Sequence, residues 1–540
     1  MPHASITISL FLLCASLTAQ TPLLNVFGDS TTKSLGRFAT RAGDVDRDGY
    51  QDFIVGLENM GNGVGGARVY SGRDGRVIHH FTGGTNPLAQ MGVGVAPAGD
   101  INSDGYADVM ISSPIHPKNG ISAGHVQIMS GKDGKLIREH YGDGPGDLFG
   151  LGVNGIGDIN GDGVDDYIIG APENGDPVNN YGTGYARLYS GKDGKTIHTF
   201  KGYEVISEFG FSVAPAGDVN RDGITDIIIG STLEGYGAGS ARVFDGKTRK
   251  MLYNFPAPQE GDHFGVCVNS AGDVDADGHA DVLVGAANAY SFLKGAVWVF
   301  SGRTGKALYH IKGSATSGML GRWVQGIGDV NNDGHADFIG GDPGDKTGSP
   351  KRGSFRCYSG KDGKQLFVIY GDGGGFGVQC DNMGDMNGDG SPELLCCVPD
   401  ARYKSKPAGM VSIRSLRPVA PFGDGCSARK VAPRLEMTTA VIGKTSIVFL
   451  KGPIHTGGIL ALSMLLHRPT AIGSNCYLHL DLPTAIPVAV FQTDAAGRWS
   501  ISCPIPNTPG LVGATYAAQS ALKVPVGAEL TNGLHFTITR

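Results

Sequence analysis

The chain has 540 residues and a formal net charge of −6, and 18% of its residues are charged. It is longer than one ordinary domain, which suits a large repeat array with an added module. Glycine is abundant, at 87 residues, but it shows no G-X-Y period, so collagen is excluded. Short apolar runs between Gly-rich turns predict an all-β protein, and we expect no nucleic-acid partner.

The N-terminal segment has the pattern of a secretory signal. An apolar core, Ile6–Leu17, is followed by Thr18 and Ala19 before Gln20, so residues 1–19 are predicted to be a signal peptide that is cleaved after Ala19. No later apolar run is long enough to span a bilayer. We therefore expect a secreted, monomeric protein that works outside the cell or at its surface, without a transmembrane segment.

The motif that organises the chain is seen at Asp100–Ser112, which reads D-I-N-S-D-G-Y-A-D-V-M-I-S. Gly105 stands at position 6, where a chain that wraps around an ion must turn sharply. Oxygen-bearing side chains stand at positions 1, 3, 5 and 9, which suits Ca²⁺ because this ion takes about six to eight oxygen ligands. The loop is not an EF-hand, because Ile111 occupies position 12, where an EF-hand has Glu.

The same loop motif occurs seven times along the chain. Its copies are spaced by 56, 58, 60, 55, 56 and 56 residues, and a fixed period of this size is the signature of a repeat architecture. Each copy is predicted to hold one Ca²⁺, up to seven in all, which would shift the formal charge from −6 to +8. The predicted side-chain ligands at positions 1, 3, 5 and 9 are Asp44, Asp46, Asp48 and Asp52; Asp100, Asn102, Asp104 and Asp108; Asp158, Asn160, Asp162 and Asp166; Asp218, Asn220, Asp222 and Asp226; Asp273, Asp275, Asp277 and Asp281; Asp329, Asn331, Asp333 and Asp337; Asp385, Asn387, Asp389 and Glu393.

Each repeat also predicts four short strands. An F-G step such as Phe264-Gly265, or a looser version such as Met91-Gly92, opens the unit, and a strand leads from it to the metal loop. An apolar strand that ends in a G-A-P-like step follows, then a variable loop and a third strand. A tight hairpin with a D-G tip, S-G-K-D-G-K at Ser130–Lys135, precedes the fourth strand. Four short antiparallel strands per repeat describe the blade of a β-propeller.

The F-G start, the D-x-D/N-x-D-G-x-x-D loop and the G-A-P finish resemble the FG-GAP repeats of integrin α-subunit propellers and their bacterial relatives, over residues 20–417. The resemblance implies a seven-bladed β-propeller with Ca²⁺ in the first hairpin of each blade. Seven complete loops look more like the bacterial members, since integrins usually fill only some blades. The seventh loop departs from the pattern, because Glu393 follows Pro392 where the other loops have Asp, and we expect a weaker site there. The resemblance also implies a ligand from the backbone carbonyl of position 7, which is Tyr50, Tyr106, Val164, Ile224, His279, His335 or Ser391.

The ring is expected to be closed by the N-terminal segment. The seventh unit stops at Ala408–Leu416 without a fourth strand, whereas Leu23–Asp29 resembles the fourth-strand ending Leu136–Asp143. If Leu23–Gly28 completes the last blade, two open sheet edges disappear from the ring.

Up-and-down strands place the first and third hairpins on one face of the ring, and the second and fourth connections on the other. The metal face then carries basic hairpin tips, which we interpret as solvated turn residues: Arg73, Arg76, Lys132, Lys135, Lys192, Lys195, Lys361 and Lys364. The opposite face carries variable loops with aromatic residues, which are better candidates for binding: Tyr181, Tyr203, Tyr236, Tyr290, Phe292 and Tyr403.

After Arg417 the pattern changes. Residues 418–425 are predicted to be a linker, and residues 426–540 contain short apolar runs that predict a small β-sandwich-like module. This module resembles C-terminal modules of secreted bacterial proteins. Cys426 and Cys476 are the preferred disulfide pair among nine Cys, while Cys396 and Cys397 are expected to be buried strand residues.

The chain shows little sign of catalysis. It has no C-x-x-C or H-E-x-x-H pattern, and three Trp are too few for a quinoprotein propeller, which needs one in each blade. We expect a calcium-binding scaffold for adhesion to an extracellular protein or polysaccharide. The alternative is an extracellular hydrolase or lyase with its site in the propeller face or channel, which a buried carboxylate or His cluster there would favour.

Overall fold

The computed structural model divides the chain into two compact units, one of residues 18–418 and one of residues 1–17 with 419–540. It describes residues 22–416, except for gaps at 30–31, 33–34, 59, 62, 85–89, 173–181, 259–261, 289–293, 315–317, 348–352, 372–373, 389 and 404–405, and seven strands of the other unit.

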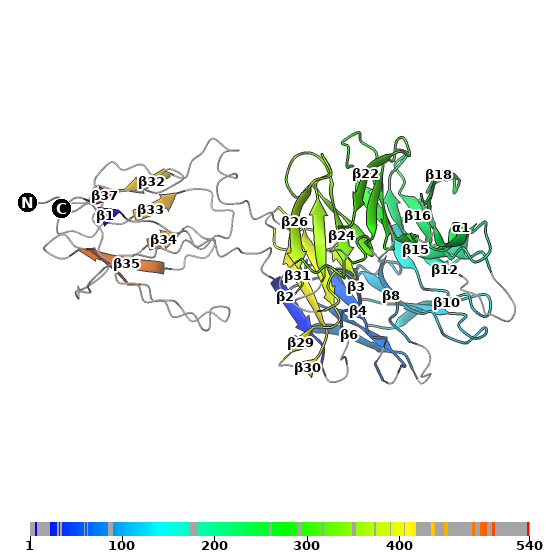
Figure 1. Ribbon diagram of the computed structural model, residues 1–540. Coiled ribbons are helices and arrows are strands. Elements are labelled where there is room, and N and C mark those ends of the chain that lie inside the picture. Colours follow the sequence, from blue (N-terminus) through cyan, green and yellow to red (C-terminus); the bar gives the residue numbers. More distant parts are fainter. Residues whose placement is uncertain are drawn as a thin grey trace, which may run out of the picture. The chain divides into compact units, whose positions relative to one another are not determined.

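The described part of the larger unit forms seven antiparallel four-stranded sheets, the blades of a propeller (Figure 1). The innermost strands contact one another from blade to blade and are β3 (Phe38–Gly43), β7 (Val95–Gly99), β11 (Val153–Gly157), β15 (Phe209–Gly217), β19 (Phe264–Gly272), β23 (Trp323–Gly328) and β27 (Cys380–Asn382). The second strands are β4 (Asp52–Gly56), β8 (Asp108–Ser113), β12 (Asp166–Ala171), β16 (Asp226–Ser231), β20 (Asp281–Ala286), β24 (Asp337–Asp342) and β28 (Glu393–Val398).

The outer half of each blade is a hairpin in the first six blades and is built from both ends of the unit in the seventh. The third strands are β5 (Gly66–Tyr70), β9 (His125–Met129), β13 (Tyr185–Tyr189), β17 (Ser240–Phe244), β21 (Ala296–Phe300), β25 (Ser354–Tyr358) and β31 (Met410–Ser415). The fourth strands are β6 (Val77–Thr82), β10 (Leu136–Tyr141), β14 (Thr196–Lys201), β18 (Met251–Pro256), β22 (Ala307–Lys312), β26 (Gln365–Tyr370) and, in the seventh blade, β2 (Pro22–Phe27). Two short pieces lie in connections, the single turn α1 (Glu234–Gly237) and the pair β29 (Arg402–Tyr403) and β30 (Lys406–Pro407).

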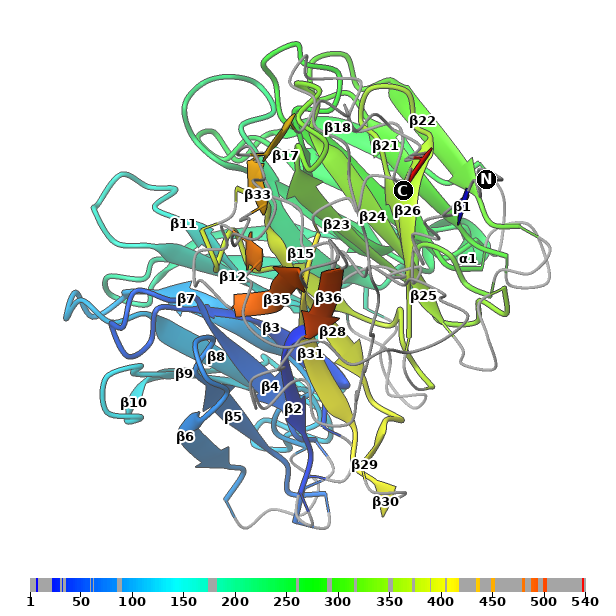
Figure 2. The same ribbon diagram turned by 90° about the vertical axis from the view of Figure 1, so that its left-hand side faces the viewer.

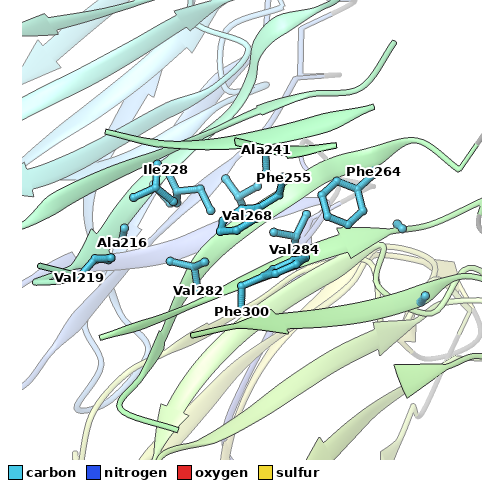
Figure 3. Packing of buried hydrophobic residues seen from close by; sticks show 14 residues of the cluster. Ala216, Val219, Ile228, Ala241, Phe255, Phe264, Val268, Val282, Val284 and Phe300 are labelled. Atoms are coloured by element: carbon cyan, nitrogen blue, oxygen red, sulfur yellow. The ribbon is translucent and has the colours of Figure 1, made fainter. Parts of the chain in front are cut away.

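The hydrophobic core is divided among the seven contacts between neighbouring blades. One cluster joins β15–β18 to β19–β22, and Figure 3 shows Phe264, Val268 and Val284 of the later blade packed against Ile228 and Phe255 of the earlier one. Because a neighbouring blade covers each face of the sheet, every residue of β16 is buried, and its sequence does not alternate between apolar and polar residues.

The Phe-Gly step is explained by this packing. Phe264 is 1% exposed, and Gly265 has a φ of +88°. A Cβ on Gly265 would lie 2.3 Å from the Ser240 carbonyl oxygen, so only glycine fits between the two blades.

The predicted closure of the ring is confirmed. β2 pairs with β31 in antiparallel register, with Leu24 opposite Ile413 and Phe27 opposite Met410, and the two strands lie side by side in Figure 2. Leu24 packs in the cluster between the seventh and first blades. The last blade is therefore completed by a strand from the other end of the unit.

The smaller unit contains a five-stranded sheet among its described residues. Its strands are β32 (Arg434–Met437), β33 (Val448–Lys451), β34 (Leu478–Leu480), β35 (Pro487–Thr493) and β36 (Trp499–Ser502), and β1 (Ile6–Thr7) pairs with β37 (Thr537–Ile538). The β-sandwich, the linker, the signal peptide and the Cys426–Cys476 disulfide stay predictions, since the residues that would decide them lie outside the described ones.

Candidate metal centres

Each metal loop begins where an innermost strand leaves its sheet. In the first blade the register shifts between Arg41 and Gly43, and Gly43 has a φ of +86°. A glycine precedes position 1 in every copy, and the register shifts beside it in the first six blades, where a β-bulge turns the chain out of the blade and into the loop. Position 4 is also left-handed in all seven loops, including Arg47 and Ala276 with φ of 59°, which the sequence analysis did not foresee.

Positions 1, 3 and 5 converge through a repeated set of hydrogen bonds. In the second blade, Asp100 Oδ1 accepts the Asp104 N–H at 3.0 Å, and its Oδ2 accepts the Gly105 N–H at 2.7 Å. Asn102 Oδ1 accepts the Asp104 N–H at 3.0 Å, and Asp104 Oδ1 accepts the Tyr106 N–H at 3.1 Å. The backbone of this loop therefore folds around the side-chain oxygens of positions 1, 3 and 5.

Among the described residues, two loops bring three carboxylates together, and both have Asp at position 3, where the other five loops have Asn. One oxygen from each of Asp44, Asp46 and Asp48 lies within 4.8 Å of the others, as do oxygens of Asp273, Asp275 and Asp281. In the sixth loop, the buried Oδ1 of Asn331 has no hydrogen-bond partner among the described residues. An all-oxygen donor set with an unused buried acceptor fits a hard cation such as Ca²⁺.

The position-9 carboxylate has a second structural role that the sequence analysis missed. Asp108 has no solvent exposure. Its Oδ2 accepts the Ile101 N–H at 3.1 Å, and its Oδ1 accepts the Gly131 N–H of the third hairpin at 3.0 Å. The same pair of bonds recurs at Asp52, Asp166, Asp226, Asp281 and Asp337.

The position-9 side chain ties the metal loop to the third hairpin, and each oxygen of Asp108 keeps a lone pair for an ion. Burial raises the pKa of the position-9 carboxyls, to about 7 for Asp52 and Asp281 and to about 6 for Asp108, Asp166, Asp226 and Asp337. The contact also explains the glycine of each S-G-K-D-G-K hairpin. A Cβ on Gly131 would lie 1.9 Å from the Ala107 carbonyl oxygen. The repetition of this Ser-Gly step in the sequence was the available signal.

Neighbouring metal loops are joined to each other. The Ala107 N–H, at position 8, donates to the Asp44 carbonyl of the preceding blade at 3.3 Å, and the Ala336 N–H does so to the Asp273 carbonyl at 2.9 Å. At position 7, the His335 ring contacts the Val274 carbonyl at 2.8 Å. The Ala280 N–H likewise donates to the Asp218 carbonyl at 3.1 Å, so these bonds join the first loop to the second, the fourth to the fifth and the fifth to the sixth.

The seventh loop lacks several of these supports. Pro392 stands at position 8 and has no N–H to give to the sixth loop. The seventh blade has no third hairpin, because its fourth strand is β2. Glu393, which is fully buried, instead accepts the Met386 N–H at 2.7 Å and the Asn387 side-chain N–H at 2.9 Å.

The basic tips of the third hairpins pair locally. Lys135, Lys195 and Lys364 each contact the Asp of their own tip at 2.6 Å. Arg76 contacts Asp74 of its own tip at 3.7 Å and also pairs with Asp46 of the first metal loop.

The opposite face carries an apolar patch, which we call the Tyr203/Tyr236 patch. It consists of Tyr203, Val205, Ile206 and Tyr236, which are 67%, 60%, 44% and 93% exposed. The first three lie in the connection between the third and fourth blades, and Tyr236 lies in α1. The Gly235 N–H donates to Glu204 Oε2 at 2.9 Å and joins the two segments.

Two features of the structure bear on how the side chains of this patch are positioned. Tyr236 has a φ of +61°, a conformation that costs a non-glycine residue energy. Arg242 is 1% exposed, pairs with Glu234 and lies under the Tyr203 ring, 4.4 Å from its centroid. Of the other aromatic candidates, Tyr181, Tyr290, Phe292 and the Tyr403 side chain lie outside the described residues.

Comparison with known proteins gives a consistent result. The FG-GAP repeat model matches residues 209–244 and 269–300. Integrin alpha-5 from Xenopus laevis is 29% identical over 203 residues, which is 35% of this chain and 19% of that protein. Integrin alpha-V from Gallus gallus is 29% identical over 258 residues, 46% and 20% of the two chains. Integrin alpha pat-2 from Caenorhabditis elegans is 30% identical over 226 residues, 37% and 18%.

The matches therefore span about a fifth of the length of these curated relatives. Among solved structures, one described as the structure of the Dos1 propeller aligns with 68% of this chain and 74% of its own, with 15% identity and a TM-score of 0.42. Among the described residues, no helix has the length and apolarity to cross a membrane.

Proposed function

We propose that this chain, an integrin α-like seven-bladed β-propeller with FG-GAP repeats, is a calcium-stabilised scaffold that binds an extracellular protein or glycan. Secretion is part of this proposal. The observation that carries it is the division of labour between two faces. The metal loops repeat nearly unchanged around one face, whereas the connections on the other differ in every blade and expose aromatic residues.

Calcium would be held by the side chains at positions 1, 3, 5 and 9 of each loop. The ion would supply positive charge among carboxylates that now face one another. The chain itself aligns these oxygens through backbone N–H groups and anchors position 9 to the third hairpin. Because positions 1 and 9 bracket the loop, binding is expected to stiffen the first hairpin of each blade.

The Tyr203/Tyr236 patch is the proposed part of the ligand site. Its four side chains are exposed, and aromatic residues supply contact area at low entropy cost. Glu204 lies beside them and is exposed as well. The hydrogen bond from Gly235 and the buried Arg242 hold both segments in place before any ligand arrives, which lowers the cost of binding.

An array of extracellular proteins and glycans, probed in Ca²⁺ and again in EDTA, tests this function. We expect a ligand whose binding is weakened at least tenfold by Tyr236→Ala and Tyr203→Ala, about 1.4 kcal/mol or more. The calcium content of these variants should stay unchanged. The matched controls are charge reversals at Lys132 and Lys192 on the metal face, which should bind normally. Loss of binding in these controls alone would move the site to the metal face. Cleavage of a bound polysaccharide would favour the alternative, a hydrolase or lyase.

A further inference from the structure

Two cysteines face each other across the inner hairpin of the seventh blade. β27 pairs with β28, and Cys380 stands directly opposite Cys396. Both have no solvent exposure, and both belong to the same apolar cluster, between the sixth and seventh blades. Their side chains therefore leave the sheet on the same face. Cys397 packs in the cluster on the other face, between the seventh and first blades.

The hydrogen bonds of this strand pair identify the kind of position. The Cys397 N–H donates to the Gln379 carbonyl at 3.1 Å, and the Met383 N–H donates to the Glu393 carbonyl at 2.8 Å. Hydrogen-bonded and non-hydrogen-bonded pairs alternate along an antiparallel ladder. The pair of Cys380 and Cys396 is next to the first of these bonded pairs and is therefore a non-hydrogen-bonded pair.

This position has the spacing that a disulfide needs. The two Cα atoms of a non-hydrogen-bonded pair lie about 4.5 Å apart, with their side chains close together. Disulfides span Cα separations of about 4.4–6.8 Å. Both cysteines are free thiols in this structure, and a pair at this kind of position can be bridged without a large movement of the backbone.

We propose that Cys380 and Cys396 form a cross-strand disulfide that closes the hairpin around the seventh metal loop. The oxidant is a disulfide donor, either a small-molecule disulfide or that of an oxidoreductase. One thiolate attacks a donor sulfur and releases the first donor thiolate, and the second thiolate then attacks the mixed disulfide and releases the other. The protein loses two protons and two electrons, and the donor disulfide becomes two thiols.

Burial dictates when the bond forms. Desolvation raises the pKa of the Cys396 thiol to about 12 and that of Cys380 well above its usual range, so few thiolates exist in the closed blade. Exchange therefore takes place while the blade is still open, and the finished bond is shielded from reductant.

The proposed disulfide lies in the seventh blade, whose metal loop departs from the pattern of the other six. Pro392 at position 8 of the seventh loop has no N–H to give to the sixth loop. A bond between Cys380 and Cys396 encloses residues 385–393 in a short covalent ring. It adds a covalent restraint to this loop.

Peptide mapping of the full chain tests this proposal directly. The protein is refolded in a mixture of reduced and oxidised glutathione, then denatured with an alkylating reagent and digested at acidic residues, which cuts at Glu393 between the two cysteines. We expect a linked pair of peptides that contains Cys380 and Cys396 and lacks alkylation at both. Reductant should release the link only after denaturation.

Three variants sharpen the assignment. Cys380→Ser should leave Cys396 alkylated, whereas Cys397→Ala should keep the linked peptides. Cys357→Ala is the matched control, because Cys357 is buried in the same cluster but belongs to the sixth blade. Alkylation of both Cys380 and Cys396 in the folded wild-type protein would overturn the proposal, as would a link from Cys396 to Cys357 or Cys397. The wild-type map decides the matter even if a variant fails to fold.

Discussion

Replacing a position-9 carboxylate tests whether this side chain holds the metal loop to the third hairpin even without calcium. Asp108 accepts two backbone N–H groups, from Ile101 at 3.1 Å and Gly131 at 3.0 Å, and is fully buried. Leaving a buried donor unpaired costs about 1–3 kcal/mol. Asp108→Ala leaves two such donors, so it should lower the free energy of unfolding of the metal-free protein by about 2–6 kcal/mol.

Position 5 supplies the matched variant. Asp104 accepts the Tyr106 N–H at 3.1 Å and the Asp104 backbone is already held by Asp100 and Asn102. Asp104→Ala should therefore cost the metal-free protein less than about 1 kcal/mol, because the N–H that it frees can bond to water.

Urea unfolding in EDTA at pH 7.5 measures both variants, with Asp108→Asn as an intermediate that keeps one acceptor oxygen. In saturating Ca²⁺ the two alanine variants should each lose a site and move closer together. Equal losses in EDTA, or an Asp108→Ala protein as stable as the wild type, would refute the reasoning.

Four further outcomes are expected. Chelation should lower the melting temperature sharply, because each site at a hundredfold excess of Ca²⁺ over its Kd adds about 2.7 kcal/mol; an unchanged melt in EDTA would count against structural calcium. A chain that begins at Ser30 lacks β2 and exposes the edge of β31, so it should aggregate or melt lower; the same melting curve as the longer chain would contradict the closure. The raised pKa values near 7 at Asp52 and Asp281 mean that the metal-free folded state binds more protons than the unfolded state between about pH 4 and 7. These groups therefore stabilise the metal-free fold at low pH, and that contribution is lost as the pH rises. Ca²⁺ binds the ionised carboxylate, so calorimetry should show weaker Ca²⁺ binding at pH 5.5 than at pH 7.5, with proton release on binding. Equal affinities at the two pH values would argue against these ligands. Gly131→Ala should destabilise by about 1–3 kcal/mol through its clash with the Ala107 carbonyl, and Gly144→Ala, whose Cβ meets open space, should show no clash penalty in the same melt.

The structural features that were predictable from the sequence are encoded by motifs of a few consecutive residues. The Asp100–Asp108 loop carries its own turn and its own donors, and the Phe264-Gly265 step repeats at a fixed period. The closing strand was also predictable, because Leu23–Asp29 resembles a fourth strand that one unit lacks. Repetition made each of these signals specific.

The features that were missed depend on contacts between distant residues. Asp108 meets Gly131 across 23 residues, and Ala107 reaches Asp44 in another blade. Cys380 and Cys396 become partners only through the register of β27 and β28. No regular spacing within one repeat marks these contacting pairs, so composition and spacing could not reveal them. The left-handed position 4 had a faint signal, since Gly161 and Gly388 occupy it in two copies.

The calcium content of the protein tests the central claim most directly. The chain should be dialysed to equilibrium against buffered Ca²⁺, and bound metal should be counted per chain by elemental analysis. The account predicts up to seven ions, of which one, abolished by Asp385→Ala, leaves at the lowest chelator concentration because the seventh loop has Glu393 after Pro392 where the other loops have Asp. Binding of no calcium above the level of a protein without such loops would contradict the account.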